Sequence, residues 1–468
     1  MPYENEKSSY NAPRRFADNE RIKTLLANYQ IKSPNRRRKS SPLIRVHKDG
    51  LGRSDWKPRY VIAIDGSFQA VDVEQGFPNA ELAYLTIACA IQNVEQIRKL
   101  DENRPIPPPE YRKTQDLDAL DWILPGCNVV GEEDLDARVS FRRALYEFFQ
   151  SKSMLEGDDT VIGNRETLLD TYEALLEYKP IGVQSQHCPL VDECPLDNTS
   201  QNEYKPQSGI FKCRCKEKHD WYSTDALRIH ERMMPYNGSN DRIYSEVMQV
   251  LERVWIVHIL RTIRNQKWLS SLKHIAIFLD GPLAIFGQPA WISGAITEEL
   301  KILNREIREI TGADLLLLGI EKTGVFVTHF DQLDQIQEGG KGNFPNQTVA
   351  LITDDYIKEN IVISDSDKTY GTGTYFGRKF MYKTATGERI VATLPYLDDK
   401  HKDWDTADVS QFPRLLDALN LIDEFISSSY HNALTPIVIA HAEATLPSKI
   451  GSKVLAKLAR DLTTKRSG

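Results

Sequence analysis

The chain has 468 residues, of which 41% are hydrophobic and 27% are charged, and this composition excludes wholesale disorder. The length suits two or three domains, or one elaborated domain with insertions. The N-terminal residues lack the apolar core of a secretory signal, and no apolar run approaches the length that spans a bilayer. Six cysteines in so long a chain do not make a disulfide scaffold, so we expect a cytoplasmic protein without a membrane partner.

The charge is unevenly distributed along the chain. The net charge is −7, but residues 1–59 hold 15 Lys and Arg against 6 Asp and Glu, which leaves the remainder at −16. Residues 1–55 are also polar and weakly periodic, so we predict a flexible basic arm there and an ordered domain over 56–468. The arm is either a solvated tail or a tether to nucleic acid or to a partner protein.

Apolar periodicity predicts the elements of the domain. β-branched apolar runs indicate strands at 59–67, 80–92, 274–283, 314–322 and 435–443, the first of them closed by an Asp-Gly-Ser turn. Helical spacing indicates helices at 134–152, 164–178, 241–266, 294–312 and 412–428, with a hairpin at 374–396. This alternation predicts an α/β fold with a mixed sheet, interrupted by a cysteine-containing insertion at 180–240.

Two aspartates follow strongly apolar runs and precede glycine. Asp65 lies in IAIDGS and Asp280 in IFLDGP, and carboxylates at the ends of neighbouring strands converge on one rim of a sheet. Such groups repel each other unless a cation lies between them, and carboxylates suit Mg²⁺ or Mn²⁺. Two such ions, about 3.5–4 Å apart, stabilise the attacking and leaving oxygens of a phosphodiester displacement. The alternative is that each Asp-Gly pair only makes a turn.

Two further groups are candidates for the same rim. His441, in PIVIAHAEATL, follows an apolar run and is either a ligand or a structural hydrogen-bonding residue. The long helix before Asp280 offers two glutamates, and we prefer Glu252, which lies in the apolar stretch VLERVWIV and needs a partner there, with Glu246 in reserve.

A resemblance to a known family rests on several short motifs in order. IAIDGS, IFLDGPL, GIEK, PYL and IAHAEA resemble the NurA nuclease domain over residues 59 to about 460. The resemblance implies an RNase H-like core, a metal-dependent DNA nuclease that prefers manganese, and a homodimer. It also implies a partnership with HerA, a hexameric DNA-translocating ATPase, in DNA end processing or in phage defence.

The resemblance also assigns residues by motif. Asp65, Asp280 and His441 match the family's metal-binding positions, and Glu252 matches its helical glutamate more loosely because the spacing to Asp280 is longer here. Lys322, in GIEKTG, resembles a basic position after the third strand that could hold a phosphate; the alternative is a solvent-facing turn residue.

Four cysteines of the insertion form a candidate zinc site. Two closely spaced pairs can supply the tetrahedral thiolates that Zn²⁺ requires, and either of two histidines, His187 or His219, could replace one sulfur. The alternatives are buried free thiols or a redox pair. The pairs are Cys188 with Cys194 and Cys213 with Cys215.

The hairpin interleaves basic and aromatic residues, including Tyr375, Arg378 and Lys379, which is a combination that suits single-stranded DNA. The alternative is an ordinary amphipathic hairpin.

Two other functions compete with the nuclease. One is a non-catalytic partner that binds nucleic acid or protein through the arm and the cysteine cluster, and the other is an actin-like ATPase, which would need more glycines and hydroxyls around its Asp-Gly loops.

Overall fold

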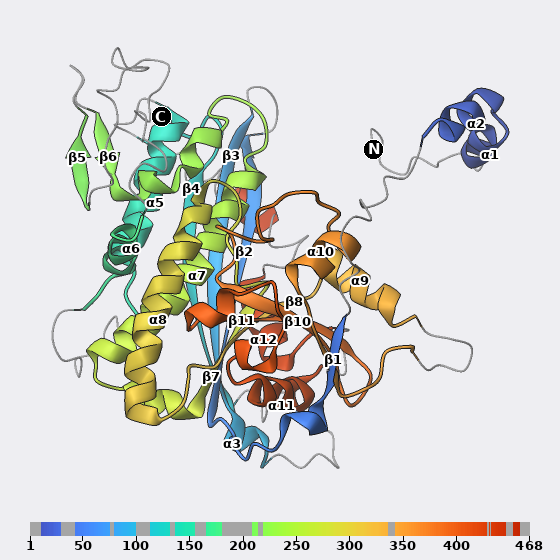
Figure 1. Cartoon of the computed structure of the whole chain (residues 1–468). Helices are drawn as coiled ribbons and strands as arrows, with labels where there is room; N and C mark the ends of the chain where they lie inside the picture. The colour runs from blue at the N-terminus through green and yellow to red at the C-terminus, as the bar shows by residue number, and fades with distance from the viewer. Residues whose placement is uncertain are drawn as a thin grey trace.

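The fold was analysed in a computed structural model (Figure 1). The described residues are 11–29, 43–74, 79–99, 113–131, 136–154, 165–179, 208–213, 219–335, 342–427, 430, 432–445 and 453–458.

A nine-stranded sheet forms the centre of the molecule. Its strands, in spatial order, are β1 (Ile44–His47), β9 (Thr348–Leu351), β10 (Gly377–Lys383), β11 (Arg389–Pro395), β8 (Leu317–Glu321), β7 (Ile275–Asp280), β2 (Tyr60–Glu74), β3 (Ala80–Asn93) and β4 (Gln115–Pro125). β7 pairs in parallel with both β2 and β8, whereas the other neighbours in this sheet are antiparallel. The predicted α/β fold with a mixed sheet is therefore confirmed.

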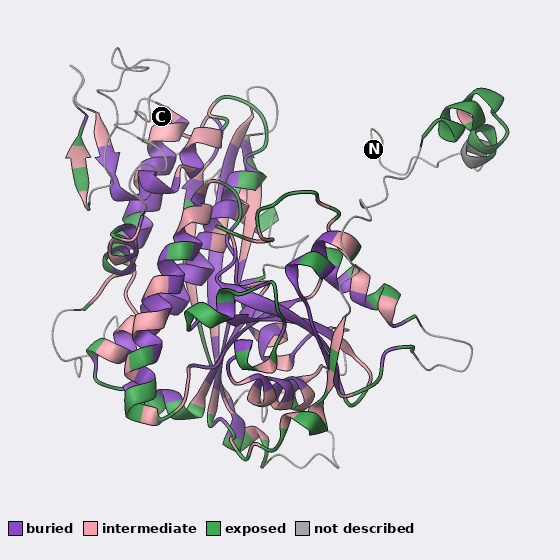
Figure 2. Ribbon diagram, in the orientation of Figure 1, coloured by how far each residue is buried: buried purple, intermediate pink, exposed green. Residues whose placement is uncertain are grey.

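Helices cover both faces of this sheet. The labelled helices are α1 (Asn11–Ala17), α2 (Glu20–Ala27), α3 (Val94–Ile97), α5 (Ala137–Ser151), α6 (Leu168–Leu176), α7 (Asp241–Asn265), α8 (Ile292–Thr311), α9 (Val325–Leu333), α10 (Asp354–Asn360), α11 (Leu415–Phe425) and α12 (Thr435–Ala444), and residues 453–458 are also helical. One face packs against α5, α6, α7 and α8, and the other packs against α11 and α12. Figure 2 shows the resulting buried interior on both sides of the strands.

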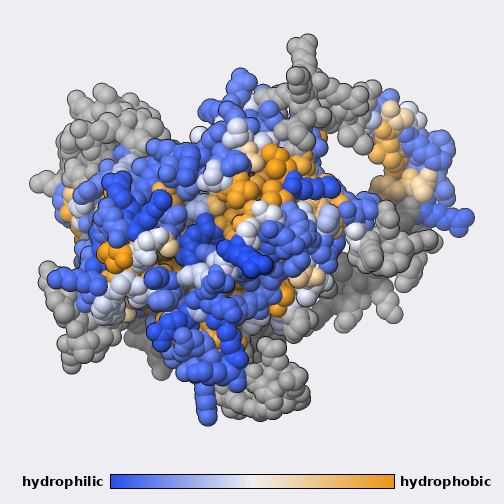
Figure 3. Space-filling model, turned by 60° about the horizontal axis from the view of Figure 1, so that its bottom comes forward, coloured by the Kyte–Doolittle hydropathy of each residue, from blue (hydrophilic) through white to orange (hydrophobic). Residues whose placement is uncertain are grey.

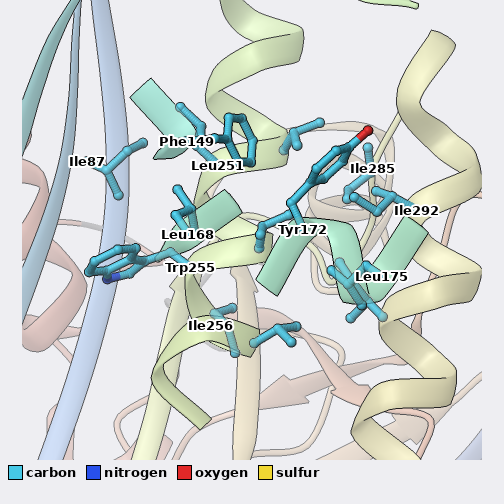
Figure 4. Packing of buried hydrophobic residues seen from close by; sticks show 14 of the residues in the cluster. Ile87, Phe149, Leu168, Tyr172, Leu175, Leu251, Trp255, Ile256, Ile285 and Ile292 are labelled. Carbon is cyan, nitrogen blue, oxygen red and sulfur yellow. The ribbon is translucent and has the colours of Figure 1, made fainter. Parts of the chain in front are cut away.

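Alternation along the strands explains the two layers. In β2, Ile62 and Ile64 belong to the core under α7, while Val61 and Ala63 belong to the core under α11 and α12. Figure 4 shows the first of these cores, where aromatic and aliphatic side chains from α5, α6 and α7 interdigitate around Tyr172 and Trp255. Because both faces of the central strands are buried, these strands are apolar throughout rather than alternating in polarity.

Two predicted features of the strands are wrong. Residues 435–443 form most of helix α12, not a strand; Pro436 lies in the first helical turn, where proline is tolerated, and a short apolar run cannot distinguish a buried helix from a buried strand. Moreover, β2 does not end in a turn at Asp65 but continues to Glu74, paired with β3 throughout.

The N-terminal region divides into two parts. Residues 44–47 form β1, which pairs with β9, so the ordered body begins before residue 56. α1 and α2 lie apart from the body in Figure 1, α2 buries none of its residues, and Phe16 and Leu26 are each 64% exposed. Figure 3 shows the apolar side of these two helices next to a hydrophilic one.

The insertion contributes a two-stranded sheet of β5 (Ile210–Lys212) and β6 (Asp220–Tyr222). Among the described helices, none combines the length and the apolar composition that crossing a bilayer requires.

Candidate metal centre

The centre is built where β7 ends beside β2. These strands are parallel, with Ile64 opposite Leu279, so the next residue of each strand is an aspartate and the two carboxylates are neighbours. After Asp280 the chain turns away through Gly281, whose φ of +89° lies in the left-handed region that favours glycine. The sheet-rim argument from the sequence therefore places Asp65 and Asp280 together, although only Asp280 lies at a strand end.

His441 reaches the same place from α12, which covers the face of the sheet to which Asp65 points. α12 packs across β2 and β3, and His441 Nδ1 lies 2.6 Å from Asp65 Oδ2. Because a carboxylate only accepts hydrogen bonds, the imidazole donates through Nδ1, which leaves Nε2 as its other polar atom, 3.3 Å from Thr445 Oγ1. Asp65, Asp280 and His441 each offer one ligand atom within 4.8 Å of the others.

Charge compensation holds these groups together. Burial raises the pKa of Asp280, and the nearby Asp65 carboxylate raises it further, whereas Lys322 lowers it. Lys322 Nζ lies 2.6 Å from Asp280 Oδ2, and the hydrogen bond with Asp65 raises the pKa of His441. Two carboxylates and an imidazole are a donor set that fits Mn²⁺, and the carboxylates also suit Mg²⁺.

Glu252 lies beside this cluster. It is 2% exposed on α7, and a Cβ added to Gly66 would lie 2.7 Å from its Oε1, so its carboxylate packs on the backbone that follows Asp65. The reserve candidate, Glu246, is occupied elsewhere, because its Oε1 pairs with Arg232 Nη1 at 2.7 Å and lies 3.4 Å from Arg242 Nε. Of the two glutamates, Glu252 is the one that contacts the strand carrying Asp65, and its role as a metal ligand stays a prediction.

Arg253 is a member of the centre that sequence reasoning missed. Its guanidinium is 4% exposed, pairs with Glu252 and donates to the Pro282 carbonyl at 3.2 Å. Burial lowers the pKa of Arg253 to about 10, while the Asp280 and Asp65 carboxylates oppose that shift, so the side chain stays cationic at neutral pH. The sequence does contain a signal for this residue. A glutamate and an arginine are adjacent within an apolar helical run, and charged side chains that become buried require partners.

The hairpin residues do not form the surface that we predicted. Arg378 is 1% exposed, and its guanidinium donates to the Asp403 and Thr406 carbonyls. Lys379 is 2% exposed, 2.6 Å from Glu321, and stacked on Tyr375, which is itself buried. The prediction of a nucleic-acid surface at these three residues is therefore wrong, because all three are buried: one face of β10 packs against the core with α11 and α12, and the other packs against the core with α9 and α10.

The cysteine cluster falls largely outside the described residues. Cys213 is buried at the end of β5, and its backbone N–H donates to the His219 carbonyl at 2.8 Å. Cys188, Cys194, Cys215 and His187 lie outside the described residues. The zinc site stays a prediction.

Comparison with known proteins identifies the family. The model of the NurA domain matches residues 59–444, a span that contains every residue of the centre described above. A search of curated proteins found no match. Since the matched span covers most of the chain, the protein belongs to the NurA domain family, a family of nucleases.

Proposed function

We propose that this protein is a metal-dependent deoxyribonuclease that hydrolyses phosphodiester bonds, with Mn²⁺ or Mg²⁺ held by Asp65, Asp280 and His441 and with Glu252 beside them. The observation that carries the proposal is the convergence of three ligand atoms within 4.8 Å from elements far apart in sequence. A divalent ion bound there supplies positive charge that stabilises the attacking and leaving oxygens of the displacement.

The protein's own side chains have separate roles in binding the ion and the DNA. Asp65 is buried and accepts from the Gly66 N–H at 2.9 Å and from His441, so its position is set before any ion binds. The His441 side chain is 54% exposed, and that of Lys322 is 27% exposed, so both border the solvent from which a DNA strand approaches. Lys322 places a cation where it can contact a phosphate oxygen.

The wider setting is proposed from family membership. We expect an RNase H-like core, a homodimer and joint action with a HerA-type hexameric ATPase, either at DNA ends or against phage. Because the chain beyond residue 59 is acidic, contact with DNA is confined to the centre and to surfaces that the partner or the basic arm supplies.

A nuclease assay tests the proposal. Labelled linear duplex and single-stranded DNA are incubated with the protein in Mn²⁺ or Mg²⁺, with and without the ATPase. Asp65→Asn and Asp280→Asn should abolish cleavage while circular dichroism stays unchanged. Asp116→Asn, at an exposed carboxylate on β4, is the matched control and should keep full activity. Retained cleavage in both centre variants contradicts the proposal.

A further inference from the structure

We infer that Arg253 is a positioning residue of the metal centre, connecting the helical glutamate Glu252 to the turn that follows Asp280. This inference rests on the proposed function. In this role, the guanidinium holds two carboxylates, one on α7 and one at the end of β7, in the relative positions that ion binding requires.

The first support is an unusual contact. Glu252 and Arg253 are consecutive on α7, and neighbouring residues on a helix point about 100° apart and do not normally face each other. Here both side chains are nearly fully buried, at 3% and 4% exposure, and Arg253 Nη1 pairs directly with Glu252 Oε2. The guanidinium therefore turns along the helix surface toward the glutamate, and Nη1 also lies 3.4 Å from the Gln249 carbonyl.

The second support is the contact with the turn. Arg253 Nη2 donates to the Pro282 carbonyl at 3.2 Å, two residues after Asp280. A Cβ added to Gly281 would lie 3.2 Å from the same Nη2, so the guanidinium packs directly on the turn. The Arg253 guanidinium thus contacts both the backbone turn that follows Asp280 and a carboxylate oxygen of Glu252.

The third support is the balance of charge. Asp65 and Glu252 are 4% and 2% exposed and the side chain of Asp280 is 18% exposed, and an unpaired buried carboxylate is strongly unfavourable. Lys322 and His441 contact the two aspartates, whereas Glu252 pairs with Arg253. The forked guanidinium can satisfy Glu252 with one Nη and the turn with the other, which a lysine ammonium cannot do in the same geometry.

The effect expected is on the affinity for the ion. Outer residues that orient metal ligands commonly change metal affinity by about 10–100-fold when they are replaced. We therefore expect Arg253→Met to weaken Mn²⁺ binding by about tenfold or more, and Arg253→Lys, which keeps the charge but loses the fork, to weaken it by a smaller factor.

The experiment measures Mn²⁺ binding by isothermal titration calorimetry on the full chain without DNA, together with thermal unfolding and with kcat and KM for DNA cleavage. The matched control is Arg261→Met. Arg261 lies about two turns further along the same helix and forms partly buried ion pairs with Glu166 at 2.5 Å and Glu299 at 2.7 Å. It should lower the unfolding temperature while leaving the Mn²⁺ affinity at the wild-type value.

Each result decides one question. Weaker Mn²⁺ binding in both Arg253 variants, with unchanged binding in Arg261→Met, supports the positioning role. Wild-type Mn²⁺ affinity in Arg253→Lys and Arg253→Met overturns it, even if both unfold at a lower temperature. If Arg253→Met does not fold, Arg253→Lys decides alone by the same criterion. A wild-type protein that binds no Mn²⁺ and cuts no DNA refutes the proposed function itself.

Discussion

Gly66→Ala is the substitution whose outcome the structure determines most sharply. A Cβ at this position would lie 2.7 Å from Glu252 Oε1, 2.8 Å from Met248 Cγ and 2.9 Å from Ile87 Cδ1, all closer than real Cβ contacts. Overpacking of this kind costs about 1–3 kcal/mol, whereas removing a glycine from a strand recovers about 0.5–1 kcal/mol. The net expectation is a destabilisation of about 0–2.5 kcal/mol, toward the upper part of that range because three atoms are too close at once.

The same substitution should impair the centre. The Glu252 carboxylate has to move to admit the methyl group, so the Mn²⁺ affinity should fall by about tenfold. Urea unfolding measures the stability, and calorimetry with Mn²⁺ measures the affinity. Gly294→Ala is the control, because nothing lies within 4 Å of its added Cβ in helix α8, and it should be neutral or stabilising. Wild-type stability and Mn²⁺ affinity in Gly66→Ala would refute the reasoning that Glu252 abuts the strand.

Three further predictions concern other parts of the chain. Arg378→Met should destabilise the fold by about 1–3 kcal/mol, because it removes the hydrogen bonds that the buried guanidinium donates to the Asp403 and Thr406 carbonyls; urea unfolding checks this, and folded variant protein should bind DNA as the wild type does. Burial lowers the pKa of Lys179 to about 8, so the unfolded chain holds that proton more tightly, and unfolding free energy should rise with pH from about 8 toward the ordinary value of 10.5. Replacing Lys179 by Met should remove that part of the rise, and a flat wild-type profile would contradict it. Elemental analysis of protein purified without chelators should find zinc, and Cys194→Ser or Cys213→Ser should remove it; a zinc-free wild type would exclude the site.

Much of the fold could be read from local pattern. Apolar periodicity predicts the strands that become β7 and β8, the helices α5, α7 and α8, and the hairpin of β10 and β11, because each element buries one or both faces in a hydrophobic core. The failure at α12 has a physical reason: its residues are apolar on several sides, so periodicity carries no information, and the packing across β2 and β3 selects the helix. The prediction for the hairpin residues failed for a different reason, because the sequence pattern cannot tell a strand with one exposed face from a strand that is covered on both faces.

The sequence by itself predicted that Asp65 and Asp280 would share one rim, because each follows an apolar run typical of a buried strand. Only the tertiary structure decided what surrounds them. The parallel register of β2 and β7 sets their spacing, and α12 brings His441 to Asp65. The close approach of α7 explains why residue 66 has no side chain. Contacts between residues more than a hundred positions apart in the sequence depend on how the helices pack on the sheet. Local secondary-structure propensity carries no information about that packing.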